Sequence, residues 1–361
     1  MATKERRIFS VMESDVDAVV LMNGGEPNID TAFFYATGIP NGLFEECLAI
    51  VRPDRMEVLS STLEETSARS AGIRTSVFDD SDGRMKLAQK KLRGFKRIGV
   101  NHEDLTVKNY NFIKKAAQGA KLVDVSEDLF NARVVKQPDE IDLIEKACKI
   151  ASKAGEEIPE IVHEGQTDTG AAAELNRKMM IMGATGPAFV SGIAFGPDTA
   201  EPHYQPQGRK LKRGQLALFD FGAAYRRYVS DVTRTFVCGK PSVRQNEMYD
   251  IVLKAQLAAI DAIHDGVHGK DVDRAARDII DRSKFRGLFI HSTGHGIGIS
   301  VHDPGRISSS KDMVIKKDMV LTVEPGVYVP GFGGVRIEDD ILVTKDGCKV
   351  LTPCTKEFRT V

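Results

Sequence analysis

Residues 216–236 read LALFDFGAAYRRYVSDVTRTF, and the rest of the chain is organised around this stretch. Apolar residues lead to Asp220, a polar basic segment follows, and β-branched residues then flank Asp231. Such runs on both sides of a polar reversal are typical of a β-hairpin. A reversal at Tyr225 and Arg226 places Asp220 directly opposite Asp231, with the two Cβ atoms roughly 5 Å apart. Like charges at that separation destabilise a sheet unless a cation lies between them.

A second stretch repeats the arrangement. Residues 322–343 run from Glu324 through a glycine-rich reversal centred near Gly331 to Glu338, so these two acids also face each other. Between the two hairpins, His295 lies in the run HSTGHGIG, whose glycines leave room for a metal and a substrate to approach the backbone. Four carboxylates and one imidazole suit two divalent first-row ions.

Asp220 and Asp231 could instead be a pair of ordinary turn acids, which are common beside reversals. Both acids, however, lie within apolar strand stretches, where a lone carboxylate is costly to bury. Glu324 and Glu338 repeat the pattern. The sequence therefore favours a metal site over turn acids.

Three further histidines are candidates for the surroundings of this site. His302 follows His295 by seven residues, His291 precedes it, and His203 lies in a loop-like stretch. The remaining histidines have no comparable context, and we expect them at the surface: His102, His163, His264 and His268.

Arg336 lies two residues before Glu338 and therefore shares its face of the strand. It can neutralise the acid cluster, or it can also hold a substrate carboxylate, and both interpretations stay open. The basic run at residues 209–214 is expected to be a solvated turn.

Composition excludes several classes of function. The 361 residues suffice for two domains, and a net charge of −1 provides no long-range attraction to nucleic acid or to an anionic membrane. Five scattered cysteines without a CxxC pair suit a reducing compartment. No apolar run reaches the roughly 20 residues of a membrane span, and the N-terminus lacks the apolar run of a signal peptide. We expect a cytoplasmic protein.

Residues 1–132 alternate strand and helix patterns, which predicts an α/β domain with a mostly parallel or mixed sheet. The expected strands are 18–22, 46–51, 56–59 and 97–100, and the expected helices are 62–71 and 85–92.

Residues 133–361 are expected to form a second, α+β domain that begins with a helix at Pro138. This part shows a possible internal duplication. Gly165 precedes a helix at 169–182 and then the first hairpin, and Gly266 precedes a helix at 271–282 and then the second hairpin. Two such halves facing each other would build a site at their seam, with one acid pair from each.

The motifs DFGAAYRRYVSDVTRTF, HSTGHGIGISVHDPG, VEPGVY and GGVRIEDD, in this order, resemble the metallopeptidases of the pita-bread fold. That family holds methionine aminopeptidase, aminopeptidase P and prolidase. The resemblance covers residues 133–361, and residues 1–132 are similar to the smaller domain of prolidases, aminopeptidases P and creatinases. It implies the pita-bread fold with a pseudo-twofold duplication, and a homodimer.

The resemblance also implies roles for individual residues. Asp220, Asp231, His295, Glu324 and Glu338 match the five ligands of a dinuclear centre, in which Asp231 and Glu338 bridge the ions. His203, His291 and His302 match substrate-side histidines, and Arg336 matches the arginine beside the last ligand. Mn²⁺ or Co²⁺ is expected, and Zn²⁺ or Fe²⁺ also suits an oxygen-rich site with one imidazole.

The implied activity is hydrolysis of Xaa-Pro bonds in small peptides, foremost dipeptides. A hydroxide bridging the ions attacks, Glu324 shuttles the proton, and His302 and His203 bind the scissile carbonyl. Arg336 and His291 are the cationic candidates for the substrate carboxylate.

The motifs leave the exact activity open. The compact Glu324–Glu338 hairpin favours a prolidase, whereas the pair His203-Tyr204 favours an aminopeptidase P. A creatinase-like or lyase reaction on the same fold, and a non-catalytic binding protein, stay open as well.

Overall fold

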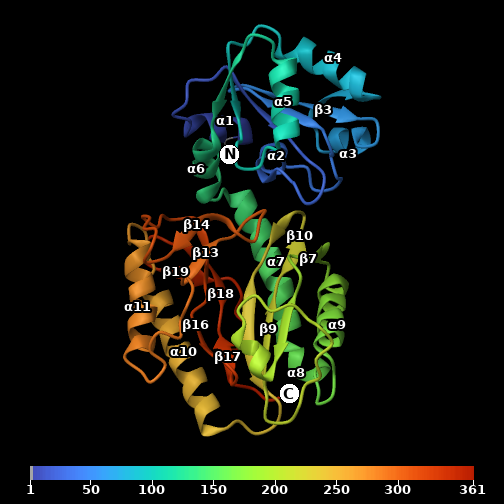
Figure 1. Cartoon of the computed structure of the whole chain (residues 1–361). Coiled ribbons are helices and arrows are strands. Elements are labelled where there is room, and N and C mark those ends of the chain that lie inside the picture. Colours follow the sequence, from blue (N-terminus) through green and yellow to red (C-terminus); the bar gives the residue numbers. More distant parts are fainter. Residues whose placement is uncertain (1–2) are drawn as a thin grey trace. The chain divides into compact units, whose positions relative to one another are not determined.

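A mixed sheet of six strands forms the centre of the N-terminal unit, which ends at Arg133 (Figure 1). The computed structural model describes residues 3–361. The strand order is β4-β3-β2-β1-β5-β6; β2 pairs antiparallel with β1 and β3, and the other neighbours are parallel. The strands are β1 (Ala18–Met22), β2 (Leu48–Val51), β3 (Met56–Ser61), β4 (Arg74–Phe78), β5 (Arg97–Val100) and β6 (Lys121–Asp124). The predicted mixed sheet is confirmed.

The strands missed in this unit are those with weak apolar patterns. β4 and β6 are the edge strands, and most of their residues are only partly buried or exposed, so no apolar run marks them. Helices α3 (Glu65–Ser70) and α4 (Ser81–Leu92) correspond to the two predicted helices. The sequence did not reveal α1 (Lys4–Ser10), α2 (Thr31–Thr37), α5 (Val107–Ala116) and α6 (Ser126–Val134).

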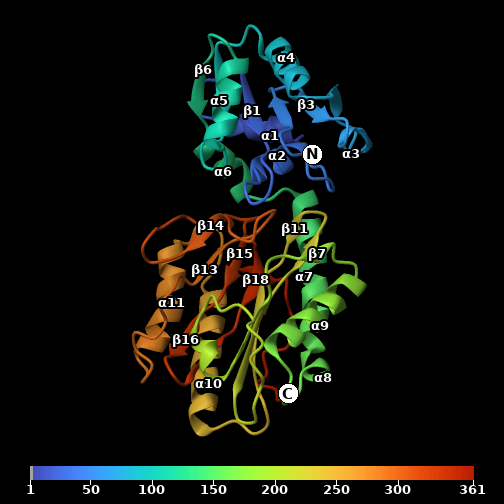
Figure 2. The ribbon, with the colours of Figure 1, turned by 45° about the vertical axis from the view of Figure 1, so that its right-hand side comes forward.

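The second unit, Val134–Val361, begins its long helix α7 (Pro138–Glu156) at the predicted proline. The backbone N–H of Gln137 donates to the Glu140 side chain, which satisfies one of the unpaired groups of the helix start. Figure 2 shows α7, α8 and α9 on one side of the strands and α10 and α11 on the other. Their bounds are α8 (Ile158–Ile161), α9 (Asp168–Ile181), α10 (Val243–Asp261) and α11 (Gly269–Asp281), with a 3₁₀ helix η1 (Gly196–Ala200).

Two antiparallel sheets form the inner layer of this unit, with strand orders β12-β9-β8 and β14-β13-β15-β18-β19. The first half contains β7 (Gly186–Pro187), β8 (Gly192–Phe195), β9 (Leu216–Phe221), β10 (Ala223–Tyr225), β11 (Tyr228–Val229) and β12 (Val232–Val237). The second half contains β13 (Gly294–Gly296), β14 (Asp303–Ile307), β15 (Val320–Val323), β16 (Gly326–Val329), β17 (Gly333–Arg336), β18 (Asp339–Val343) and β19 (Cys348–Val350).

Matching backbone hydrogen bonds confirm the internal duplication. The N–H of Gly165 donates to the Leu211 carbonyl at 2.8 Å, and the N–H of Gly266 donates to the Ile315 carbonyl at 2.8 Å. An isolated bridge follows in each half, Thr167 to Lys210 and His268 to Val314. These equivalences align residues 210–220 with 314–324. Asp220 and Glu324 therefore occupy corresponding positions at the ends of β9 and β15.

The predicted reversal of the first hairpin was wrong by one residue. Arg226 and Arg227 form the turn, both with positive φ, 48° and 72°, and Asp220 pairs with Thr233 rather than with Asp231. A two-residue turn of this kind follows the right-handed twist of the flanking strands. Because Asp231 lies two residues before Thr233, the two aspartates still share one face of the sheet, on a diagonal.

The second hairpin has the predicted register. Gly326 pairs with Arg336 and the ladder closes around Gly331, which has a φ of 76°. Extending this register by two residues sets Glu324 opposite Glu338.

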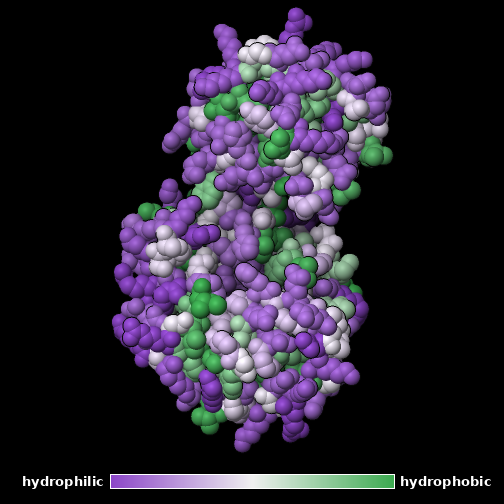
Figure 3. All heavy atoms as spheres, in the orientation of Figure 1, coloured by the Kyte–Doolittle hydropathy of each residue, from purple (hydrophilic) through white to green (hydrophobic). Residues whose placement is uncertain are grey.

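None of the helices in the described part of the chain has the length and apolar character that crossing a bilayer requires. On the face seen in Figure 3, hydrophilic residues predominate over both units and apolar residues occur in small groups.

Arg234 on β12 ties the two halves of the second unit together. Its guanidinium is 2% exposed and donates to Asp339 Oδ1 at 2.7 Å on β18 of the other half. It also donates to the carbonyls of Thr355 at 3.0 Å and Cys354 at 2.7 Å in the C-terminal segment.

We predict that Arg234→Met lowers the free energy of unfolding by about 3–5 kcal/mol, because Asp339 then loses its guanidinium partner in a buried position. Denaturant unfolding followed by circular dichroism measures this change. Arg177→Met, which removes an exposed ion pair with Glu174, is the control and should stay within about 0.5 kcal/mol. Equal effects of the two substitutions would contradict the prediction.

Candidate active site

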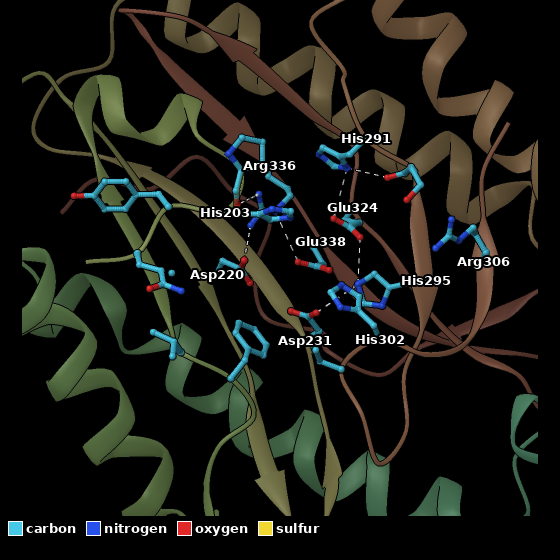
Figure 4. A pocket seen from close by; sticks show the side chains of 18 residues that line it. His203, Asp220, Asp231, His291, His295, His302, Arg306, Glu324, Arg336 and Glu338 are labelled. Carbon is cyan, nitrogen blue, oxygen red and sulfur yellow. Dashed lines mark hydrogen bonds and ion pairs between the residues drawn. The ribbon is translucent and has the colours of Figure 1, made fainter. Parts of the chain in front are cut away.

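A cavity of about 550 Å³ lies between the two halves of the second unit (Figure 4). All five predicted metal ligands and all three predicted substrate-side histidines line it, together with Arg336. The other side chains at its wall include Phe189, Val190, Tyr204, Gln205, Val301 and Arg306.

The predicted ligands converge within this cavity. One ligand atom from each of Asp231, His295 and Glu338 lies within 4.8 Å of the others. His295 Nε2 is 3.3 Å from Glu324 Oε1 and 3.7 Å from Asp231 Oδ2. Asp220 lies at the other side of the cluster, beside Arg336.

Glu324 and Glu338 occupy a break between two ladders. The Glu324 N–H donates to the Thr293 carbonyl at 2.8 Å, and the Glu338 N–H donates to the Thr233 carbonyl at 3.1 Å on the other half. Their backbones therefore bond to segments other than each other, and the Thr233 hydroxyl donates to Glu338 Oε2 at 2.5 Å.

Burial raises the pKa of every carboxyl in the cluster. The pKa of Glu324 rises to about 8, and those of Asp231 and Glu338 rise well above the ordinary range because neighbouring carboxylates add repulsion to burial. Burial also raises the pKa of Asp220, although Arg336 opposes that shift. In contrast, burial lowers the pKa of His295 to about 4, so its imidazole is neutral and can serve as a ligand.

These residues fit divalent cations. Asp231 Oδ1 is buried without a hydrogen-bond partner among the described residues, although a buried polar atom normally has one. Arg336 alone cannot balance four carboxylates, and the donor set of carboxylate oxygens with one neutral imidazole is one that divalent first-row ions accept.

The glycines around His295 have a packing role that the sequence did not predict. A Cβ atom on Gly294 would lie 1.9 Å from the Thr322 carbonyl oxygen, and one on Gly296 would lie 2.0 Å from that of Pro304. They allow β13 to pack closely between its neighbouring strands, and this packing aims His295 into the cavity.

Each of the three guanidinium nitrogens of Arg336 donates a hydrogen bond inside the protein. It donates to Asp220 Oδ2 at 2.6 Å, to the Thr233 hydroxyl at 2.9 Å and to the Tyr328 hydroxyl at 3.1 Å. The side chain is only 4% exposed. This geometry favours the interpretation that Arg336 neutralises the acid cluster.

His291 is held by hydrogen bonds at both ring nitrogens. Nδ1 lies 2.8 Å from the Ser292 carbonyl, which can only accept, so Nδ1 carries the proton and Nε2 accepts from the Tyr328 hydroxyl at 2.8 Å. Burial lowers the pKa of His291 to about 4. The imidazole is therefore neutral near pH 7.

His302 and His203 are exposed at the cavity wall. The ring of His302 packs edge-on against His295 with centroids 4.4 Å apart. The four histidines predicted at the surface, His102, His163, His264 and His268, are exposed and do not line this cavity, as expected. In the basic run 209–214 every residue except Leu211 is exposed.

Sequence reasoning missed Thr233, Tyr328, Asp340 and Arg306. Asp340 Oδ2 accepts from the backbone N–H of Asp231 at 2.8 Å and from the Cys148 thiol at 3.3 Å, so it orients a predicted ligand. Two signals were available: Thr233 shares a strand face with Asp231, and three consecutive acids end at Asp340.

Comparisons with known proteins agree with the geometry. Residues 142–345 match the model of metallopeptidase family M24, and residues 10–135 match the creatinase/prolidase N-terminal domain. The chain is 42% identical to the Xaa-Pro dipeptidase of Pyrococcus furiosus over 70% of this chain and 72% of that one.

Two solved structures cover nearly the whole chain. An Xaa-Pro dipeptidase from Bacillus anthracis superposes with a TM-score of 0.91 at 31% identity over 99% of both chains. An X-Pro aminopeptidase from Thermotoga maritima has the same TM-score, 0.91, at 29% identity over 100% of both chains. With the pita-bread fold and the acid cluster in place, the chain belongs to metallopeptidase family M24.

Proposed function

We propose that the protein hydrolyses the Xaa-Pro bond of dipeptides. The observation that carries this proposal is the cluster of four carboxylates and one neutral imidazole, in a cavity that Arg306 also lines. Relatives named Xaa-Pro dipeptidase support it, at 42% and 41% identity.

Five side chains would hold two divalent ions, Mn²⁺ or Co²⁺ foremost: Asp220, Asp231, His295, Glu324 and Glu338. Bound there, such ions supply Lewis-acid stabilisation of negative charge on oxygen and make water a stronger acid.

Glu324 is the proposed proton carrier. It takes a proton from the attacking water and delivers it to the proline nitrogen, which must leave as an amine. Its carboxyl lies at the cavity wall, within reach of a bound water. His302 and His203, which also line the cavity, donate hydrogen bonds to the scissile carbonyl oxygen.

The substrate carboxylate requires a positive charge that is not already engaged. Proline's imide nitrogen has no N–H, so recognition depends on the ring and on this carboxylate. Each guanidinium nitrogen of Arg336 already donates a hydrogen bond within the protein, and His291 is neutral. Arg306 lines the cavity on the opposite side from Asp220 in Figure 4, and its guanidinium forms no hydrogen bond or ion pair with any described residue. We therefore assign the carboxylate to Arg306.

The first test compares Ala-Pro with Ala-Pro-Ala, using protein loaded with Mn²⁺ or Co²⁺ and an EDTA-treated control. We expect cleavage of the dipeptide, its loss with the chelator, and a raised KM for Ala-Pro in Arg306→Met. Lys311→Met, at an exposed position in the same segment, is the matched control. Preferential cleavage of Ala-Pro-Ala would indicate an aminopeptidase P. Absence of cleavage of both peptides would overturn the proposal.

The second test is Glu324→Gln, which removes the proton carrier and keeps the shape of the side chain. We expect kcat to fall by at least about 10²-fold, with an unchanged circular dichroism spectrum. Glu357→Gln, at an exposed position, should leave kcat unaltered. Hydrolysis by the Glu324 variant at the wild-type rate would contradict the role of this carboxyl.

A third prediction concerns stability and pH. In the metal-free protein the pKa of Glu324 is raised to about 8, whereas an unfolded glutamate titrates near 4.3. Between these values the folded state binds more protons than the unfolded state, so stability falls as the pH rises through this window. Metal binding requires ionised carboxylates, which removes this proton difference.

We therefore expect the Tm gap between metal-loaded and EDTA-treated protein to widen from about pH 6.5 to pH 8. The range begins near 6.5 because the lowered pKa values of His291 and His295 cost stability below the pKa of an unfolded histidine. Differential scanning fluorimetry at constant ionic strength measures the gap. A gap that stays constant or narrows over this range would contradict the prediction.

A further inference from the structure

We propose that Asp273 and Arg277, on helix α11 and outside the cavity, are positioning residues that fix His291 and Glu324 for the reaction. This inference rests on the proposed function, because it concerns the same site.

Asp273 and Arg277 form a bidentate ion pair one helical turn apart, in which Asp273 is buried and the Arg277 side chain is 26% exposed. Arg277 Nε donates to Asp273 Oδ2 at 2.9 Å and Nη2 donates to Oδ1 at 3.0 Å. The Asp273 residue has no exposed surface, and the guanidinium of Arg277 stacks over the Phe289 ring at 4.2 Å. Two parallel bonds and a stacked face leave the arginine little rotational freedom.

This pair binds three alternate residues of the segment that carries His291. Arg277 Nη1 donates to the Phe289 carbonyl at 2.8 Å, and Nη2 donates to the His291 carbonyl at 2.9 Å. The Thr293 hydroxyl donates to Asp273 Oδ1 at 2.8 Å. Residues 288–293 precede β13 and belong to no helix or strand, so side chains of α11 supply hydrogen bonds that a regular element would otherwise supply.

Residues 288–293 in turn fix the positions of two groups at the proposed reaction centre, the His291 side chain and the Glu324 backbone. His291 Nε2 accepts from Tyr328, and the Thr293 carbonyl accepts from the backbone N–H of Glu324 at 2.8 Å. One intermediate residue therefore separates the ion pair from the proposed proton carrier. Displacements of about 1 Å at a reacting group can lower a rate by about 10²-fold.

The same helix offers a matched control. Arg274 and Asp271 also form an ion pair, at 2.7 Å, but their side chains are 65% and 38% exposed and neither lines the cavity. Arg274→Met removes the same charge from the same helix as Arg277→Met, without touching residues 288–293.

The experiment measures kcat and KM of Arg277→Met, Arg277→Lys and Arg274→Met with the metal-loaded, full-length enzyme at a temperature where each is folded. We expect kcat of Arg277→Met to fall about 10- to 100-fold, with a smaller change in KM. Arg277→Lys keeps the charge and one hydrogen bond, and should recover part of the loss. Arg274→Met should stay within about twofold of wild type.

Asp273→Asn serves as a second variant if Arg277→Met does not fold, since it keeps the volume and removes the charge. The inference would be overturned if the kcat of Arg277→Met, or of Asp273→Asn where Arg277→Met does not fold, lay within twofold of the kcat of Arg274→Met.

Hydrogen exchange of a peptide covering residues 288–294 provides a readout that needs no substrate. We expect faster exchange in Arg277→Met and unchanged exchange in Arg274→Met, and equal exchange in the two variants would also overturn the inference. If the wild-type enzyme cleaves neither Ala-Pro nor Ala-Pro-Ala, the proposed function is wrong. The exchange rates would still decide whether this ion pair holds residues 288–293 in place.

Discussion

The mutual repulsion of four carboxylates, two buried and two partly buried, is the constraint on which the rest of the second unit depends. Asp220, Asp231, Glu324 and Glu338 share one cavity, and burial raises the pKa of each. Arg336 offsets part of the charge through Asp220, and the remainder requires protons or divalent cations. The chain maintains this unfavourable arrangement because strand pairing holds Asp220, and hydrogen bonds from the backbone N–H groups of Asp231, Glu324 and Glu338 hold the other three acids.

The internal duplication explains how one chain assembles such a site. The same pattern of backbone hydrogen bonds occurs in both halves, and it places Asp220 and Glu324 at corresponding positions at the ends of two strands. Hydrogen bonds between the halves then close the seam, above all those of Arg234 to Asp339 and of Thr233 to Glu338. The acids come from local hairpins, whereas their convergence depends on these long-range bonds.

Some polar side chains around the acids have hydrogen-bond partners within the protein, and others have none that the described residues supply. Arg336 and His291 donate or accept at well-defined partners and therefore maintain the shape and charge of the cavity. The Arg306 guanidinium has no such partner among residues 3–361, and it supplies a charge that a ligand can use. Asp273 and Arg277 lie outside the cavity wall and contact residues 288–293 through two backbone carbonyls and the Thr293 hydroxyl. A residue can therefore matter to this site without facing it.

The sequence by itself determined the two hairpins, their four acids, His295 and a donor set that suits divalent metal ions, because strand periodicity and turn composition are local properties. It did not determine the turn at Arg226 and Arg227, since adjacent two-residue reversals differ little in local preference and the paired strands select between them. The sequence also did not reveal the hydrogen-bond partners of Arg336 and Arg277. Those side chains meet atoms from segments distant in the chain, and only the packed tertiary structure brings them together.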